Sequence, residues 1–90
     1  MQFEFDERKS EANSEKHGID FVEAQELWAD AVRVEFSLQS AGEKRFGVLA
    51  WHAGSIWLAV ITYRQGAVRI ISVRRATAKE VSFYDRANHN

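Results

Sequence analysis

Residues 32–75 are a succession of strand-like segments joined by short loops, and this pattern constrains the fold more than any other feature. In residues 32–38, apolar side chains alternate with polar ones, which is the period of a strand with one buried face. Three further segments follow at spacings that suit hairpins, namely residues 45–53, 56–63 and 68–75. We therefore predict a meander of four antiparallel strands.

The third predicted strand, residues 56–63, is apolar on both of its faces. One face would carry Ile56, Leu58 and Val60, and the other Trp57, Ala59 and Ile61. A strand of this kind is typical of the centre of a sheet that is covered on both sides. We therefore expect this strand to be central.

The residues before the strands predict a first helix. Asp6 suits its N-cap, and the helix would run to His17. Gly18 suits its end, because glycine readily adopts the left-handed conformation found after helices. Upstream, Phe3 and Phe5 alternate around a polar residue, which fits either a short strand or two aromatic plugs.

A second helix is predicted from the capping-box pattern of Asp20 and Glu23, and it would end near Asp30. One face of this helix is apolar and would cover the sheet, with Phe21, Ala24, Leu27, Trp28 and Ala31.

A final helix is predicted from a second capping box, Thr77 with Glu80. Its inward face would carry Ala78, Val81 and Tyr84. The predicted fold is α+β, with two N-terminal helices, a four-stranded antiparallel meander sheet and a C-terminal helix. We expect one domain over residues 1–90, in which residues 88–90 form a frayed tail.

Composition argues against several classes of function. The chain has no cysteine, so neither a disulfide framework nor a thiolate metal site is possible. The three histidines, His17, His52 and His89, lack the spacing of a ligand pair, so we expect no metal and no cofactor. The longest apolar run, residues 56–61, is too short to span a bilayer, and a cytoplasmic protein is expected.

Charge is distributed unevenly along the chain. Residues 1–45 hold eleven acidic and six basic side chains, whereas residues 46–90 hold two acidic and six basic ones. The first half therefore carries −5 and the second +4. A basic surface on one part of the fold would serve a polyanion, although a pI near 6.3 argues against avid, non-specific binding of nucleic acid.

Two groups of residues are candidates for a functional site. Lys9, Asn13, Lys16 and His17 share one side of the first predicted helix, as a phosphate-contacting stripe would. The alternative is an ordinary solvated helix in which His17 interacts with the negative end of the helix dipole.

Arg74 and Arg75 form the second group. They end the last strand just before a capped helix, where an oxyanion or phosphate could bind. Alternatively, they shield a sheet edge or pair with the acidic half of the chain. Tyr84 is either a core residue with its hydroxyl at the rim or a proton donor at this site.

Two motifs in a fixed order carry a family resemblance. The first is F-E-F-D-E-R-K-S-E-A-N-S-E-K-H-G-I-D-F-V-E-A at residues 3–24, and the second is R-I-I-S-V-R-R-A-T-A-K-E-V-S-F-Y at residues 69–84, with Arg45-Phe46 between them. In these motifs the chain resembles the BrnT toxins of bacterial type II toxin-antitoxin systems. It departs from them at Phe5, where the family has tryptophan, at Val73, where it has alanine, and at Leu49-Ala50-Trp51, where it favours isoleucine-glycine.

The resemblance implies a RelE-like fold and a ribonuclease that arrests translation. It also implies a partner, a BrnA-like ribbon-helix-helix antitoxin, that neutralises the toxin in a heteromeric complex and brings it to operator DNA.

In a metal-free mechanism, the charge on the phosphate would then be stabilised by Arg74, Arg75 and Arg45, and protons would be transferred by His17 or Tyr84. Lys9, Asn13 and Lys16 would bind the RNA. This mechanism requires the stripe and the arginine pair to meet in one hollow. The alternatives are a catalytically silent module that holds an acidic partner with the same basic surface, and, with less support, a DNA-binding regulator.

Overall fold

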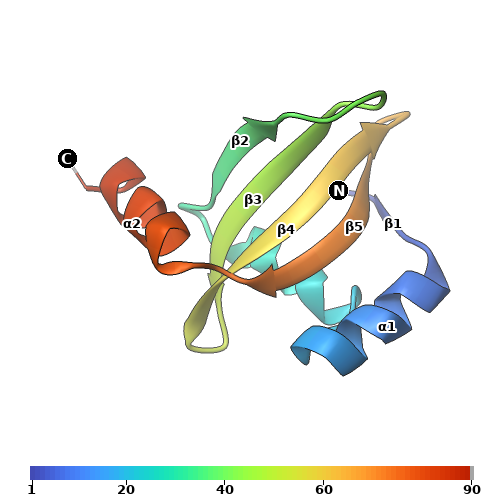
Figure 1. Ribbon diagram of the computed structural model, residues 1–90, viewed down its shortest axis with the longest axis horizontal. Helices are drawn as coiled ribbons and strands as arrows, with labels where there is room; N and C mark the ends of the chain where they lie inside the picture. The colour runs from blue at the N-terminus through green and yellow to red at the C-terminus, as the bar shows by residue number, and fades with distance from the viewer. Residues whose placement is uncertain (90) are drawn as a thin grey trace.

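The computed structural model describes residues 1–89 and contains a sheet, two α-helices and one 3-10 helix (Figure 1). The elements follow in the order β1 (Phe3–Glu4), α1 (Glu7–His17), η1 (Glu23–Ala29), β2 (Val34–Leu38), β3 (Arg45–His52), β4 (Ser55–Arg64), β5 (Ala67–Arg75) and α2 (Ala78–Ala87). The predicted α+β class is confirmed.

The sheet has five strands in the order β1-β5-β4-β3-β2. The predicted antiparallel meander is present as β2 to β5, with β4 in the middle of the sheet. The prediction of four antiparallel strands is nevertheless wrong, because β1 adds a fifth strand that runs parallel to β5. A two-residue strand leaves almost no periodic signal, and Phe3 is held in register by its pairing with Val68.

One face of the sheet, here called the helical face, is covered by α1 and η1 (Figure 1). Its core is built from three strands and from the segment around η1, and includes Ile19, Phe21, Ala24, Leu27, Val48, Ala50, Trp57, Ala59, Ile61, Val68, Ile70 and Val73. Phe3 and Phe5 pack on this core, with edge-to-face contacts to Trp28 and Phe21 respectively. The N-terminal pair is thus both a strand and a set of aromatic plugs.

The opposite face, here called the open face, is contacted by α2 (Figure 1). There the ring of Phe83 meets that of Phe36 edge to face, at 5.5 Å between centroids. Gly47, paired with Phe36, leaves the space that this ring fills.

Helix α1 begins and ends where its caps predict. The Asp6 carboxylate accepts hydrogen bonds from the backbone N–H groups of Arg8 and Lys9. Gly18 has a φ of 76° and donates its N–H to Ser14 O. Both boundaries therefore follow from single residues at the helix ends.

The second predicted helix is a 3-10 helix, so the prediction of an α-helix there is wrong. The Asp20 carboxylate does accept the Glu23 N–H at 2.8 Å. The Glu23 carboxylate, however, lies 2.8 Å from the His52 ring and does not return to the Asp20 backbone. Only half of the capping box is formed, and the segment between two buried anchors, Phe21 and Leu27, winds more tightly.

Helix α2 has the predicted capping box, since Thr77 and Glu80 exchange both of its hydrogen bonds. Its predicted inward face is wrong in part: Ala78 is exposed, and no residue of the helix is fully buried. Asn88, expected in the frayed tail, donates from its side chain to Val32 O and Tyr84 O. Asn90 lies outside the described residues.

The pairing of β4 with β5 contains one irregularity. Ile61 pairs with Ile70, but Val60 pairs with Ser72, so Ile71 is an extra residue in β5. Side chains before and after this bulge therefore follow different alternations.

Candidate functional site

The two arginines at the end of β5 project to opposite faces of the sheet, because successive side chains of a strand alternate. Arg75 shares the helical face with Trp57, its partner in the strand pairing. Arg74 shares the open face with Glu80 of α2, to which it is bonded. The structure therefore does not bring the predicted pair into a single anion site.

Arg75 is exposed and lies over an aromatic ring. Its guanidinium carbon is 5.1 Å from the centroid of the Trp57 ring, a distance typical of a cation-π contact. One guanidinium nitrogen also donates to Ser55 Oγ at 3.1 Å. These contacts hold the charge in place and leave most of the guanidinium edge available to an anion.

His17 ends α1, which packs against β5. The helix starts after β1, whose Glu4 pairs with Arg69, and it reaches Val73 at Asn13. It therefore advances along β5 towards Arg75, and its C-terminal end lies below the end of β5 (Figure 1). The ring of His17 is half-buried and has no hydrogen-bond partner among residues 1–89.

Arg74 is engaged within the protein. Two of its guanidinium nitrogens bond the two Glu80 oxygens at 2.8 and 2.9 Å, and one also donates to Arg75 O. The bond to Arg74 is the main cause that holds the pKa of Glu80 below its usual range, and the pKa of Arg74 is raised by the same contact. This bidentate pair anchors the first turn of α2.

Tyr84 is engaged as well. Its hydroxyl donates to Asp30 Oδ2 at 2.7 Å, and burial together with this carboxylate raises the pKa of Tyr84 to about 12. Burial alone would raise the pKa of Asp30, but bonds from the Trp51 N–H, the Tyr84 hydroxyl and the Val32 N–H outweigh it and lower that pKa. Tyr84 thus ties α2 to the segment before β2.

Asn13 is buried, with 7% of its surface exposed, and its amide is used in the fold. The side-chain nitrogen donates to Ile19 O and Val73 O, and the side-chain oxygen accepts the Val73 N–H. The amide pairs with both backbone groups of Val73, as a neighbouring strand would. Any contact between this side chain and RNA would require these bonds to break.

The remaining candidates are exposed but separated. Lys9 and Lys16 of α1 are exposed, although they flank the buried Asn13 on the same side of the helix. Arg45 begins β3 at the level of Thr62 on β4, whereas Arg75 pairs with Trp57. These levels are five residue steps apart along β4, about 16 Å at the usual strand rise. Arg45 and the two terminal arginines therefore do not form one cluster.

Several residues at these positions were missed by sequence reasoning. Trp57 and Ser55 fix Arg75, and Asp30 fixes Tyr84. Periodicity could have indicated the first, since Trp57 and Arg75 lie on neighbouring predicted strands near one end of the meander. No local pattern links Asp30 to Tyr84, which are 54 positions apart.

Neither a metal cluster nor a membrane span is found in the part of the chain that the structure describes. Over residues 1–89, no three His, Cys, Asp or Glu side chains gather as metal ligands would. Within the same range, no helix combines the length and apolar character needed to cross a bilayer.

Comparison with known proteins identifies the family. A search of the curated proteins finds no match to this chain. A family model described as "Ribonuclease toxin, BrnT, of type II toxin-antitoxin system" matches residues 5–80. The match covers α1, the meander and the start of α2, and so includes every predicted site residue except Tyr84. The chain therefore belongs to the BrnT family of ribonuclease toxins of type II toxin-antitoxin systems.

Proposed function

We propose that this protein is a metal-independent, RelE-like endoribonuclease that cuts RNA and thereby inhibits translation. The single observation that carries the proposal is the match of residues 5–80 to a ribonuclease toxin family. The arrangement at the end of β5 supports it, because an exposed guanidinium and a half-buried imidazole lie towards the same end of the helical face.

The proposed reaction is an internal phosphoryl transfer in RNA. The 2′-oxygen attacks the adjacent phosphorus, the bond from phosphorus to the 5′-oxygen breaks, and a 2′,3′-cyclic phosphate and a 5′-hydroxyl remain. A base takes the proton of the 2′-hydroxyl, and an acid gives a proton to the leaving 5′-oxygen. Positive charge stabilises the pentacoordinate phosphate. Side chains of this chain can supply each of these roles.

We assign proton transfer to His17 and phosphate stabilisation to Arg75. An imidazole can accept and donate a proton near neutral pH. A guanidinium carries a permanent charge and can bind two phosphate oxygens. Lys9 and Lys16, both exposed on α1, are proposed contacts for the RNA backbone.

Arg74 and Tyr84 remain proposed site residues, but only if their present hydrogen bonds are broken first. Each is bonded to a carboxylate, Arg74 to Glu80 and Tyr84 to Asp30. Either could reach a phosphate only after its carboxylate partner is exchanged for the ligand. Their first role in this proposal is to hold α2 in place.

As a type II toxin the protein has an antitoxin partner. We propose that this partner is a BrnA-like protein with a ribbon-helix-helix DNA-binding part, and that the complex reaches operator DNA only through it. The proposed location is the cytoplasm, where messenger RNA and ribosomes are found.

A second candidate is a catalytically silent module that grips an acidic partner segment with the same basic surface. One observation favours it: Arg74 and Tyr84 already bind carboxylates within the chain. The Asn13 amide, in addition, is already hydrogen-bonded to the backbone of β5. This candidate needs no reaction at His17.

The two candidates are separated by incubating the purified protein with RNA in EDTA. The nuclease leaves 2′,3′-cyclic phosphate ends, and His17→Ala lowers the cleavage rate by about 100-fold or more, the usual effect of removing a general base. Arg75→Ala lowers the rate as well. His89→Ala and Arg86→Ala change exposed residues of the same types and serve as matched controls.

Circular dichroism confirms that each variant is folded before its rate is compared. Unaltered RNA, both free and ribosome-bound, would support the silent module. Cleavage that His17→Ala and Arg75→Ala leave at the wild-type rate would place the chemistry elsewhere on the protein.

A further inference from the structure

At the end of the open face away from α2, one carboxylate is bonded by one arginine and lies near two others. Arg64 bonds Glu43 through two nitrogens, at 3.0 and 3.2 Å. The bond to Arg64 first, and then the charges of Arg45 and Arg69, hold the pKa of Glu43 below its usual range. A negative group on the loop before β3 is therefore seated among three guanidinium groups from three different strands.

The pairing of the strands explains this convergence. Thr62 is the partner of Arg69, and Arg64 lies two residues further along β4 on the same face. Arg45 is the partner of Leu38 and shares the face of Gly47, which is the open face. The three side chains thus project in one direction from β3, β4 and β5.

A second carboxylate, that of Glu4, lies at the same end of the sheet. Arg69 has a second partner in Glu4, but the atoms are 3.9 Å apart. Lys44 is exposed but lies towards the helical face, since its Nζ is 5.9 Å from the centroid of the Phe46 ring, which packs on the core there. Three arginines thus face two carboxylates, so the cluster keeps an excess of positive charge.

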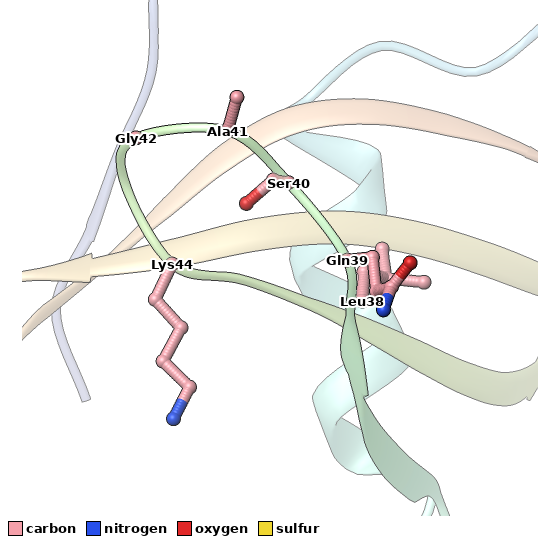
Figure 2. Close-up of a pocket in the computed structure, with 6 residues that line it drawn as sticks. All are labelled: Leu38, Gln39, Ser40, Ala41, Gly42 and Lys44. Atoms are coloured by element: carbon pink, nitrogen blue, oxygen red, sulfur yellow. The ribbon is translucent and has the colours of Figure 1, made fainter.

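Space for a ligand adjoins the cluster. A hollow of about 730 Å³ is lined by the loop from Leu38 to Lys44 (Figure 2). Ser40 holds this loop by donating to Glu43 O, and Figure 2 shows Lys44 extending away from its bend. A second hollow, of about 460 Å³, lies beside Arg64 and Glu4. The first hollow is lined by the sequence neighbours of Glu43, and the second by Arg64 itself, so a ligand bound at the cluster would have room beside it.

We propose that Arg45, Arg64 and Arg69 bind backbone phosphates of single-stranded RNA, and that the Glu43 carboxylate is an internal competitor for this site. The inference rests on the proposed function, since the cluster would be a second binding site for the RNA substrate, remote from the scissile bond. A guanidinium binds carboxylate and phosphate in the same bidentate geometry, so a phosphate can replace Glu43 directly. A ligand must therefore displace the Glu43 carboxylate to bind, which favours ligands with several negative charges over ligands with one.

The test is a binding measurement that needs no cleavage. Fluorescence anisotropy is recorded in EDTA with a labelled, fully 2′-O-methylated oligoribonucleotide, which lacks the attacking hydroxyl. Glu43→Gln is expected to tighten binding about fivefold, because Arg64 is released. Each of Arg45→Gln, Arg64→Gln and Arg69→Gln weakens it by about the same factor, and lowers the slope of log K against log salt by about 0.7.

Matched controls carry the same change of charge elsewhere. Glu26→Gln on η1 and Arg86→Gln on α2 are exposed and lie outside the cluster, so wild-type affinity is expected from both. All the changed residues except Arg69, which is half-buried, are exposed. The denaturation midpoint of Arg69→Gln is therefore measured alongside its affinity.

Two results would overturn the inference. One is wild-type affinity in Glu43→Gln and in all three arginine variants. The other is binding of poly-L-glutamate that depends on these arginines while RNA binding does not, which would assign the cluster to an acidic protein segment. Absence of cleavage would contradict the proposed function only, because the binding assay does not depend on it.

Discussion

At the scale of single residues, Asn13 shows how a polar side chain can be part of a core. It lies on the buried side of α1 with Ser10, whose hydroxyl accepts the Phe21 N–H. The strand β1 pairs with β5 only at Val68 and Arg69, so the edge of β5 beyond it needs other partners. Asn13 provides them at Val73, and this explains an asparagine in the middle of a helix.

Asn13→Ala should therefore destabilise the protein by about 3 kcal/mol, because it leaves buried backbone groups of Val73 and Ile19 without partners. The measurement is urea denaturation. Ser14→Ala, an exposed change on the same helix, is the control and should stay within about 0.5 kcal/mol of wild type. Equal midpoints for the two variants would show that the amide bonds contribute nothing.

Gly47 matters at the same scale, for its lack of a side chain. A Cβ at this position would lie 2.6 Å from Phe36 Cζ, so the ring would have to move away from Phe83. Gly47→Ala should cost about 1–2 kcal/mol, and much less when Phe36 is already alanine. A double-mutant cycle measures this difference, and a coupling energy near zero would contradict the proposed contact.

At the scale of elements, the sequence predicted boundaries well and packing less well. Asp6, Gly18 and Thr77 mark helix ends through bonds to their own neighbours, so local sequence contains the whole signal. The capping box before η1 is only half formed because the ring of His52, 29 positions away, lies 2.8 Å from the Glu23 carboxylate. A capping pattern in the local sequence does not reveal a distant side chain that binds the same carboxylate.

Helix α2 is held in part by contacts with charged side chains. Its links to the rest of the fold are Arg74 to Glu80, Tyr84 to Asp30 and the ring contact of Phe83, and none of its residues is fully buried. An element with little buried apolar surface has little stability of its own. Its attachment should therefore respond to pH.

We expect the free energy of unfolding to fall as pH drops through the acid range. The pKa values of Asp30 and Glu80 are lowered in the folded protein, so both carboxylates stabilise it above their unfolded pKa values, which are about 4. This stability is lost as pH falls through the lower, folded values. Urea denaturation between about pH 6 and pH 2 measures it.

Asp30→Asn and Glu80→Gln should each flatten this pH dependence. Lys79→Gln changes an exposed charge on α2 and leaves both contacts intact, so its slope should match the wild type. A wild-type slope in both carboxylate variants would show that these groups do not anchor the helix.

At the scale of the whole molecule, the uneven charge of the sequence is partly neutralised in the fold. Arg64 and Arg69 of the basic half contact Glu43 and Glu4 of the acidic half. The asymmetry was visible in the sequence, but its pairing was not, because each contact joins strands or loops that are distant along the chain. Arg74 and Arg75, by contrast, are adjacent in a predicted strand, so alternation alone put them on opposite faces; the face that each occupies depends on the bulge at Ile71.

The fold should also open in a fixed order. Strand β4 is central and largely buried, whereas no residue of α2 is fully buried. Native-state hydrogen exchange should therefore show α2 amides exchanging through local opening, and β4 amides only through global unfolding. Equal protection for the two elements would mean that α2 belongs to the same cooperative unit as the sheet.

The extra residue Ile71 reverses which face the following side chains of β5 point to. Arg69 and Arg74 are an odd number of positions apart, so in a regular strand they would point in opposite directions. The bulge inverts the alternation and puts both on one side, while it leaves Arg75 facing α1. A one-residue deletion here would exchange the orientations of the two terminal arginines without altering either of them, so the insertion is as much a determinant of the chemistry as the charged residues themselves.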